Sequence, residues 1–84
     1  MPRPFFPHTL QDVVHAVDGP FGLIVADMPD GVLWVLKRNK RQGRYVLTQY
    51  ADKARSSILS SEAIVDRTEA INVFSDRIAL GEHL

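Results

Sequence analysis

Residues 21–38, FGLIVADMPDGVLWVLKR, hold two apolar runs on either side of a tight-turn sequence. Within the turn, Pro29 fixes one backbone angle and Gly31 adopts positive φ without a steric penalty. The flanking runs, residues 21–28 and 32–38, are rich in β-branched and other large apolar side chains, which favour extended strands. Two such runs joined by a short turn pair as an antiparallel hairpin. This stretch therefore predicts the centre of an antiparallel sheet.

The sheet is expected to continue beyond this hairpin. Residues 39–43 are polar and end in glycine, and residues 44–51 are again rich in strand-forming residues, so we expect a second hairpin and a three-stranded meander. Residues 56–61 form either a short fourth strand or an extended link. The middle run, residues 32–36, is apolar at odd and even positions alike. Because a strand with one wet face alternates, this pattern predicts a middle strand covered on both faces.

A short helix is expected before the sheet, over residues 9–18. Thr9 and Asp12 have the spacing of a capping box with a shorter acid. Apolar residues then recur on one helical stripe: Leu10, Val13, Val14 and Val17. Gly19 and Pro20 are typical of a helix end. A helix of two turns is too short to be stable without packing, so we expect it to lie on the sheet.

A longer helix is expected after the sheet, over residues 66–81. Asp66 followed by Glu69 marks its beginning, and Gly81 marks its end. Ser61 is a competing cap, which would start the helix one or two turns earlier. With residues 1–8 as an extended proline-rich arm, anchored by Phe5 and Phe6, the chain is expected to form a single domain over residues 1–84.

The predicted fold class is therefore α+β. It comprises a short N-terminal helix, an antiparallel meander of three or four strands over residues 21–59, and a long C-terminal helix on one face of the sheet. Small domains of this outline occur in bacterial and phage-borne modules, a likeness that concerns the fold alone.

Composition excludes several classes of protein. The chain has 84 residues and no cysteine, so disulfide scaffolds, thiolate zinc sites and cysteine nucleophiles are excluded and a reducing, cytoplasmic location is expected. Its longest apolar run, residues 32–36, is far shorter than the ~20 residues that cross a bilayer. The N-terminus lacks the apolar stretch of a secretory signal. We expect no contact with a membrane.

The net charge is zero, but the charges are unevenly distributed. Residues 1–36 carry one basic and four acidic residues, residues 37–55 carry seven basic residues and one aspartate, and residues 56–84 carry two basic and five acidic residues. The basic residues gather at the tip of the second hairpin, where Tyr45 follows them. The candidate binding residues are Lys37, Arg38, Lys40, Arg41, Arg44 and Tyr45.

This basic hairpin has three interpretations. Basic side chains beside the aromatic residues Trp34, Tyr45 and Tyr50 suit phosphate contacts and base stacking. The same guanidinium groups pair with carboxylates on an acidic protein. A hairpin tip is also polar simply because water surrounds it.

The C-terminal helix has two apolar sides. At about 100° per residue, Ile71, Phe74 and Ile78 form the stripe that lies on the sheet, while Val73 and Leu80 project almost opposite. Val73 and Leu80 are either tolerated exposed residues or the contact with a second copy or another protein. With an apolar middle strand and only one short helix to cover the second face, association is favoured.

Sequence motifs for catalysis or metal binding are sparse. His8, Asp12 and His15 would lie on the solvent side of the first helix, but Asp12 is needed for capping and the His-to-His spacing is not that of a helical zinc motif. The serines of residues 56–61 have no neighbouring base, and no glycine-rich phosphate loop is present. We expect no metal, no cofactor and no enzymatic activity.

The sequence therefore predicts a small non-enzymatic interaction protein, a regulator or inhibitor that acts by contact and forms a homodimer. The alternative is a nucleic-acid-binding protein that uses the basic hairpin, residues 37–44.

Overall fold

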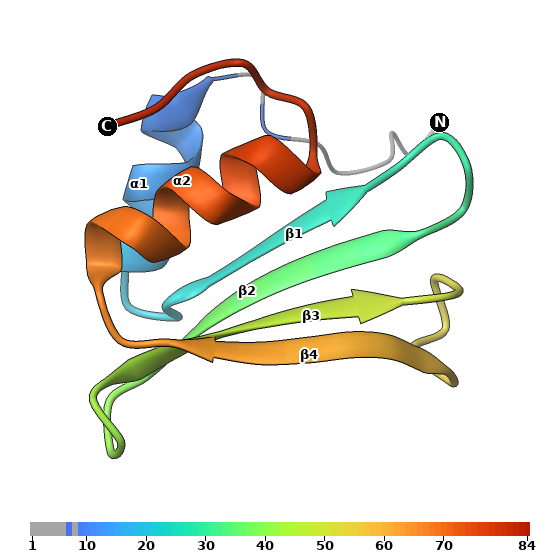
Figure 1. The fold of residues 1–84 in the computed structure, drawn as a ribbon, viewed down its shortest axis with the longest axis horizontal. Coiled ribbons are helices and arrows are strands. Elements are labelled where there is room, and N and C mark those ends of the chain that lie inside the picture. Colours follow the sequence, from blue (N-terminus) through green and yellow to red (C-terminus); the bar gives the residue numbers. More distant parts are fainter. Residues whose placement is uncertain (1–6, 8) are drawn as a thin grey trace.

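The computed structural model describes Pro7 and residues 9–84. The predicted arm falls outside this part except for Pro7, which is buried. Two helices flank four strands along the chain, and the α+β class is confirmed (Figure 1). The elements are α1 (Leu10–Asp18), β1 (Leu23–Asp27), β2 (Leu33–Asn39), β3 (Arg44–Tyr50), β4 (Ile58–Ile64) and α2 (Arg67–Arg77).

The strands form one antiparallel meander in the order β1-β2-β3-β4. Val25 of β1 pairs with Val35 of β2, and Leu36 of β2 pairs with Leu47 of β3. The two middle strands, β2 and β3, pair over their whole length without a register shift. The open question about residues 56–61 is resolved in favour of a fourth strand, which extends to Ile64 and is irregular opposite Gln49 and Tyr50.

The turn between β1 and β2 forms as its sequence predicts. The Gly31 amide donates to the Met28 carbonyl at 3.0 Å, and Gly31 has a φ of 90°. The Asp30 carboxylate accepts from the Val32 amide. Local chemistry alone thus sets the register of the first hairpin.

Helix α1 is capped as expected. The Thr9 hydroxyl accepts from the Asp12 amide, while the Asp12 carboxylate accepts from the Thr9 amide, which completes the capping box. The Glu82 carboxylate accepts from the Leu10 amide at 2.9 Å. The C-terminal tail therefore returns to α1 and adds a negative charge at its N-terminus, where the helix dipole favours one.

Helix α2 begins at its predicted cap, because the Asp66 carboxylate accepts from the Glu69 amide. Ser61 lies within β4 and caps nothing. The helix ends at Arg77, before the expected limit of residue 81. Ala79 has a φ of 56°, and the amides of Ala79 and Leu80 bond back to the carbonyls of Asp76 and Ser75. This is the Schellman arrangement, with alanine where glycine is usual.

Both helices lie on the same face of the sheet, as Figure 1 shows, and they contact each other. The core between helices and sheet contains only side chains from that face. Its buried members are Val13, Val17, Ile24, Ala26, Leu36, Leu47, Ile64, Ala70, Ile71, Phe74 and Ile78. No helix within the described residues is long and apolar enough to cross a membrane.

Candidate functional site

The sheet face opposite the helices is an apolar surface that neither of the two described helices covers. Side chains alternate along a strand, so the residues between the core positions point to this face, and no helix in the described part of the chain covers it. We call it the open face. Its apolar members, from the strand registers, are Leu23, Val25, Leu33, Val35, Val46, Tyr50, Ile58 and Ala63.

The centre of the open face is aliphatic. Leu33 and Val35 on β2 are buried to 5% and 6% exposure, yet neither belongs to the core under the helices. Val35 is flanked by Val25 on one neighbouring strand and by Thr48 on the other. At the edge, Ile58 is 61% exposed. The sequence predicts a middle strand covered on both faces; the strand carries buried apolar side chains toward both, and the described helices cover one of them.

The basic hairpin is built by β2, β3 and a four-residue loop. The Asn39 side chain accepts from the Gln42 amide and holds the loop, and Gly43 has a φ of 63°. Lys37, Lys40, Arg41 and Arg44 are all exposed. Among the described residues, no carboxylate forms an ion pair with these four side chains. We call them the four hairpin cations.

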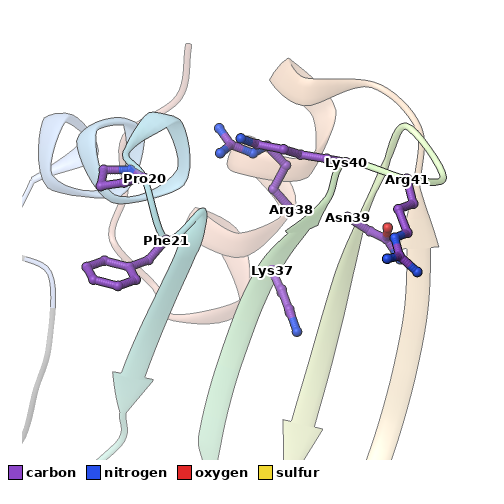
Figure 2. Close-up of a pocket in the computed structure, with 7 residues that line it drawn as sticks. All are labelled: Pro20, Phe21, Lys37, Arg38, Asn39, Lys40 and Arg41. Atoms are coloured by element: carbon purple, nitrogen blue, oxygen red, sulfur yellow. The ribbon is translucent and has the colours of Figure 1, made fainter.

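Arg38 belongs to the fold rather than to the exposed cluster. Its guanidinium donates to the carbonyls of Val17 at 2.9 Å and Gly19 at 3.1 Å, at the C-terminus of α1. Figure 2 shows Arg38 directed toward α1, whereas Lys37 points away from it. A cation is favoured at this end of a helix. Arg38 is half-buried, so its charge serves α1 more than a partner.

The aromatic residues near the hairpin are not those that the sequence favoured. Tyr45 and Trp34 are half-buried against the core, and Tyr50 lies at the far end of β3, where the Arg55 guanidinium is 5.9 Å from its ring centre. Phe21 lies beside the hairpin instead and is 88% exposed. Its place between Pro20 and Gly22, ahead of β1, is the signal that could have identified it, because a turn leaves its large side chain outside the sheet.

A shallow hollow of about 330 Å³ joins Phe21 to the hairpin (Figure 2). Its lining residues are Pro20, Phe21, Lys37, Arg38, Asn39, Lys40 and Arg41. A second hollow, of about 220 Å³, is lined by residues 38–40 and 43–45 of the hairpin together with Val65 and Arg67, so the two hollows share residues 38–40. The hairpin therefore presents a positively charged surface with an apolar ring at its border.

Val73 and Leu80 are both half-buried and pack against the core. Leu80 lies beyond the end of α2 and follows the positive-φ residue Ala79. A hydrophobic residue at this place commonly accompanies the Schellman arrangement. Their role at an interface stays a prediction, and each has only part of its surface left for a partner.

The residues weighed for a metal site serve local structure. Asp12 completes the capping box, and His15 is 2.7 Å from the Gln11 amide nitrogen, while His8 lies outside the described residues. Among the weighed serines, Ser56 donates to Asp52, whose pKa is lowered mainly by that hydrogen bond. In the C-terminal tail, His83 contacts the Asp76 carboxylate at 2.5 Å.

No protein-family model, curated protein or solved structure matches this chain.

Proposed function

We propose that this protein is a small, non-enzymatic interaction module that forms a homodimer through the open face of its sheet. It acts as a regulator or inhibitor by direct contact. The observation that carries the proposal is the aliphatic centre of that face, around Val25, Val35 and Val46, on the side of the sheet that the described helices leave uncovered.

The size of the face supports this proposal. Four strands about 4.8 Å apart, each with about five residues of 3.3 Å rise, give a face of roughly 300 Å². The whole face, polar margins included, is as large as the patches that often mark interaction sites on small proteins. Two sheets also pack well face to face, with their side chains interdigitating.

A second copy is the partner that the charges favour. Zero net charge gives two copies little mutual repulsion, and a two-fold axis lets one surface serve both partners. Lys37 and Arg44 lie at one end of the face, and the Asp27–Lys53 ion pair lies at the other. A two-fold axis that lies in the interface and runs perpendicular to the strands places the basic ends of the two copies at opposite ends of the interface.

Sedimentation equilibrium tests the proposal with the Val25→Lys variant. We expect the wild type to approach twice the 9.4 kDa chain mass at high micromolar concentration. V25K should weaken association by about tenfold or more, because an unpaired ammonium group would be buried between the sheets. Thr68→Lys, which adds the same charge on exposed α2, is the matched control and should behave as wild type.

Circular dichroism establishes that both variants are folded. A wild type that stays monomeric at high micromolar concentration contradicts the proposal. Equal dimerisation by folded V25K contradicts the placement of the interface on the open face.

A further inference from the structure

The cations of the described residues fall into two groups. Lys53, Arg67 and Arg77 have carboxylate partners, Arg38 binds carbonyls, and Arg55 lies over the Tyr50 ring. The four hairpin cations, Lys37, Lys40, Arg41 and Arg44, have no such partner in the described part of the chain. The positive charge available to a ligand is therefore concentrated on one hairpin.

The hairpin that carries this charge is held in place at both ends. At its base, the Arg38 amide donates to the Gly22 carbonyl at 2.7 Å, and the Arg38 guanidinium binds the end of α1. At its tip, Asn39 caps the loop, and Asn39 pairs with Arg44 across the strands. A fixed ribbon loses little backbone entropy on binding, so the backbone positions of its cations are pre-organised.

Phe21 supplies a feature that phosphate binding alone does not need. Phe21 is 88% exposed and is among the residues that line the same hollow as Lys37, Lys40 and Arg41, and in Figure 2 its ring points outward from the start of β1. The neighbouring backbone is constrained, because Gly22 has a φ of 57° and a Cβ atom there would come within 3.1 Å of Arg38. The fold thus presents an exposed aromatic side chain, attached to a constrained backbone, at the border of a hollow that unpaired cations also line.

We propose that this surface binds single-stranded nucleic acid. The four hairpin cations contact backbone phosphates, and one base stacks on the Phe21 ring. Basic grooves bordered by aromatic rings bind single strands in this way, because every base has a face that can stack. A peptide of acidic residues alone would satisfy the cations but would leave the ring unused. A duplex base is already stacked on its neighbours and cannot reach Phe21 without being displaced.

Fluorescence anisotropy with a labelled oligothymidylate of roughly 15 nucleotides tests this proposal. Contacts to three or four phosphates should give a slope of log affinity against log salt of about −2 to −3. Phe21→Leu should weaken binding by about 5- to 150-fold, because stacking contributes ~1–3 kcal/mol per base. Phe21→Tyr keeps a ring and should retain most of the affinity.

The charge contacts have their own matched pair of variants. Arg41→Glu removes a hairpin cation and should weaken binding and flatten the salt slope. Arg55→Glu makes the same change at the other end of β3, beyond the ~8 Å over which charges act in physiological salt, and should change affinity little. Phe21, Arg41 and Arg55 are exposed, so all the variants should remain folded, with unchanged Trp34 fluorescence.

Four results would overturn the proposal. These are absence of binding, equal affinity of F21L and wild type, equal effects of R41E and R55E, and complete competition by polyglutamate at matched charge. The last result would assign the surface to an acidic protein. Tighter binding to a duplex of the same length would refute the stacked base.

Discussion

Ala79 holds a backbone conformation that favours glycine. Its φ of 56° places it in the left-handed region at the end of α2, where a Cβ atom is strained by about 1 kcal/mol or more. The sequence pointed to Gly81 as the helix end because a glycine there is the usual signal. The chain turns two residues earlier, where Leu80 can reach the core.

Replacement of Ala79 by glycine is expected to raise the free energy of unfolding by about 0.5–1 kcal/mol. Relief of the left-handed strain exceeds the added entropy of the unfolded chain. Urea denaturation measures the change. Ala54→Gly is the control, because Ala54 is an exposed loop residue outside the positive-φ region and its change should only destabilise. An A79G variant no more stable than wild type contradicts this account.

At the scale of elements, Arg38 connects a helix to the sheet. Its two hydrogen bonds satisfy carbonyls at the C-terminus of α1, which have no partner within the helix. The sequence grouped Arg38 with its neighbours because all are basic. The alternation of β2 separates them, since Lys37 lies toward the open face and Arg38 toward the helices.

Arg38→Met is expected to lower the free energy of unfolding by about 2 kcal/mol, because two charge-assisted hydrogen bonds are lost. Arg38→Lys should recover part of this loss through one bond. Arg44→Met, at an exposed position, should change stability by less than about 0.5 kcal/mol. Equal losses for R38M and R44M in urea denaturation would show that Arg38 does not stabilise α1.

Asp18 and Arg67 connect the two helices. Arg67 donates to both carboxylate oxygens of Asp18, at 2.9 Å and 2.6 Å. This hydrogen bonding is the main reason why the pKa of Asp18 lies below its ordinary value and that of Arg67 above. Asp18 is at the end of α1 and Arg67 at the start of α2, so each charge also lies near the favourable end of the other helix's dipole.

The Asp18–Arg67 ion pair should make the free energy of unfolding depend on pH at acidic pH. The pKa of Asp18 is lower in the folded protein than in the unfolded chain, so the ionised carboxylate stabilises the fold. This stabilisation is fully present above the ordinary carboxylate pKa of about 3.9, and it is lost as the pH falls through the folded pKa. At pH 7 the free energy of unfolding of the wild type should exceed that of Asp18→Asn by about 0.5 kcal/mol. The value is small because the ion pair is exposed. In urea denaturation the difference should shrink below about pH 4. A constant difference from pH 7 to 3 contradicts this origin.

At the scale of the whole molecule, the two helices share one face of the sheet. The basic residues divide into those that bond within the fold and the exposed ones of the second hairpin. The C-terminal tail adds to the helix layer, because Ser75 donates to the Glu82 carbonyl and Asn72 accepts from the Leu84 amide. The layer on one side is thus completed by the tail, and the other side keeps an apolar sheet surface. The proposed dimer surface follows from this asymmetry, whereas the basic surface follows from the charge of the second hairpin.

Much of the fold could be predicted because its signals are local. Capping at Thr9 and Asp66, the turn at Gly31 and the alternation of the strands all depend on residues a few positions apart. The candidate site was predicted less fully. The cations at Lys37, Lys40, Arg41 and Arg44 are exposed as a hairpin tip requires, whereas the exposed ring of Phe21 was assigned to a strand.

By itself, the sequence determined the order and type of the elements except the fourth strand, and the concentration of positive charge on the second hairpin. Only the tertiary structure decided that α1 joins α2 on one face, that Arg38 serves α1, and that the tail reaches Leu10. The physical reason is the separation of the partners along the chain. Arg38 binds a carbonyl 21 residues away, and Leu10 binds a carboxylate 72 residues away, so no local pattern encodes either contact.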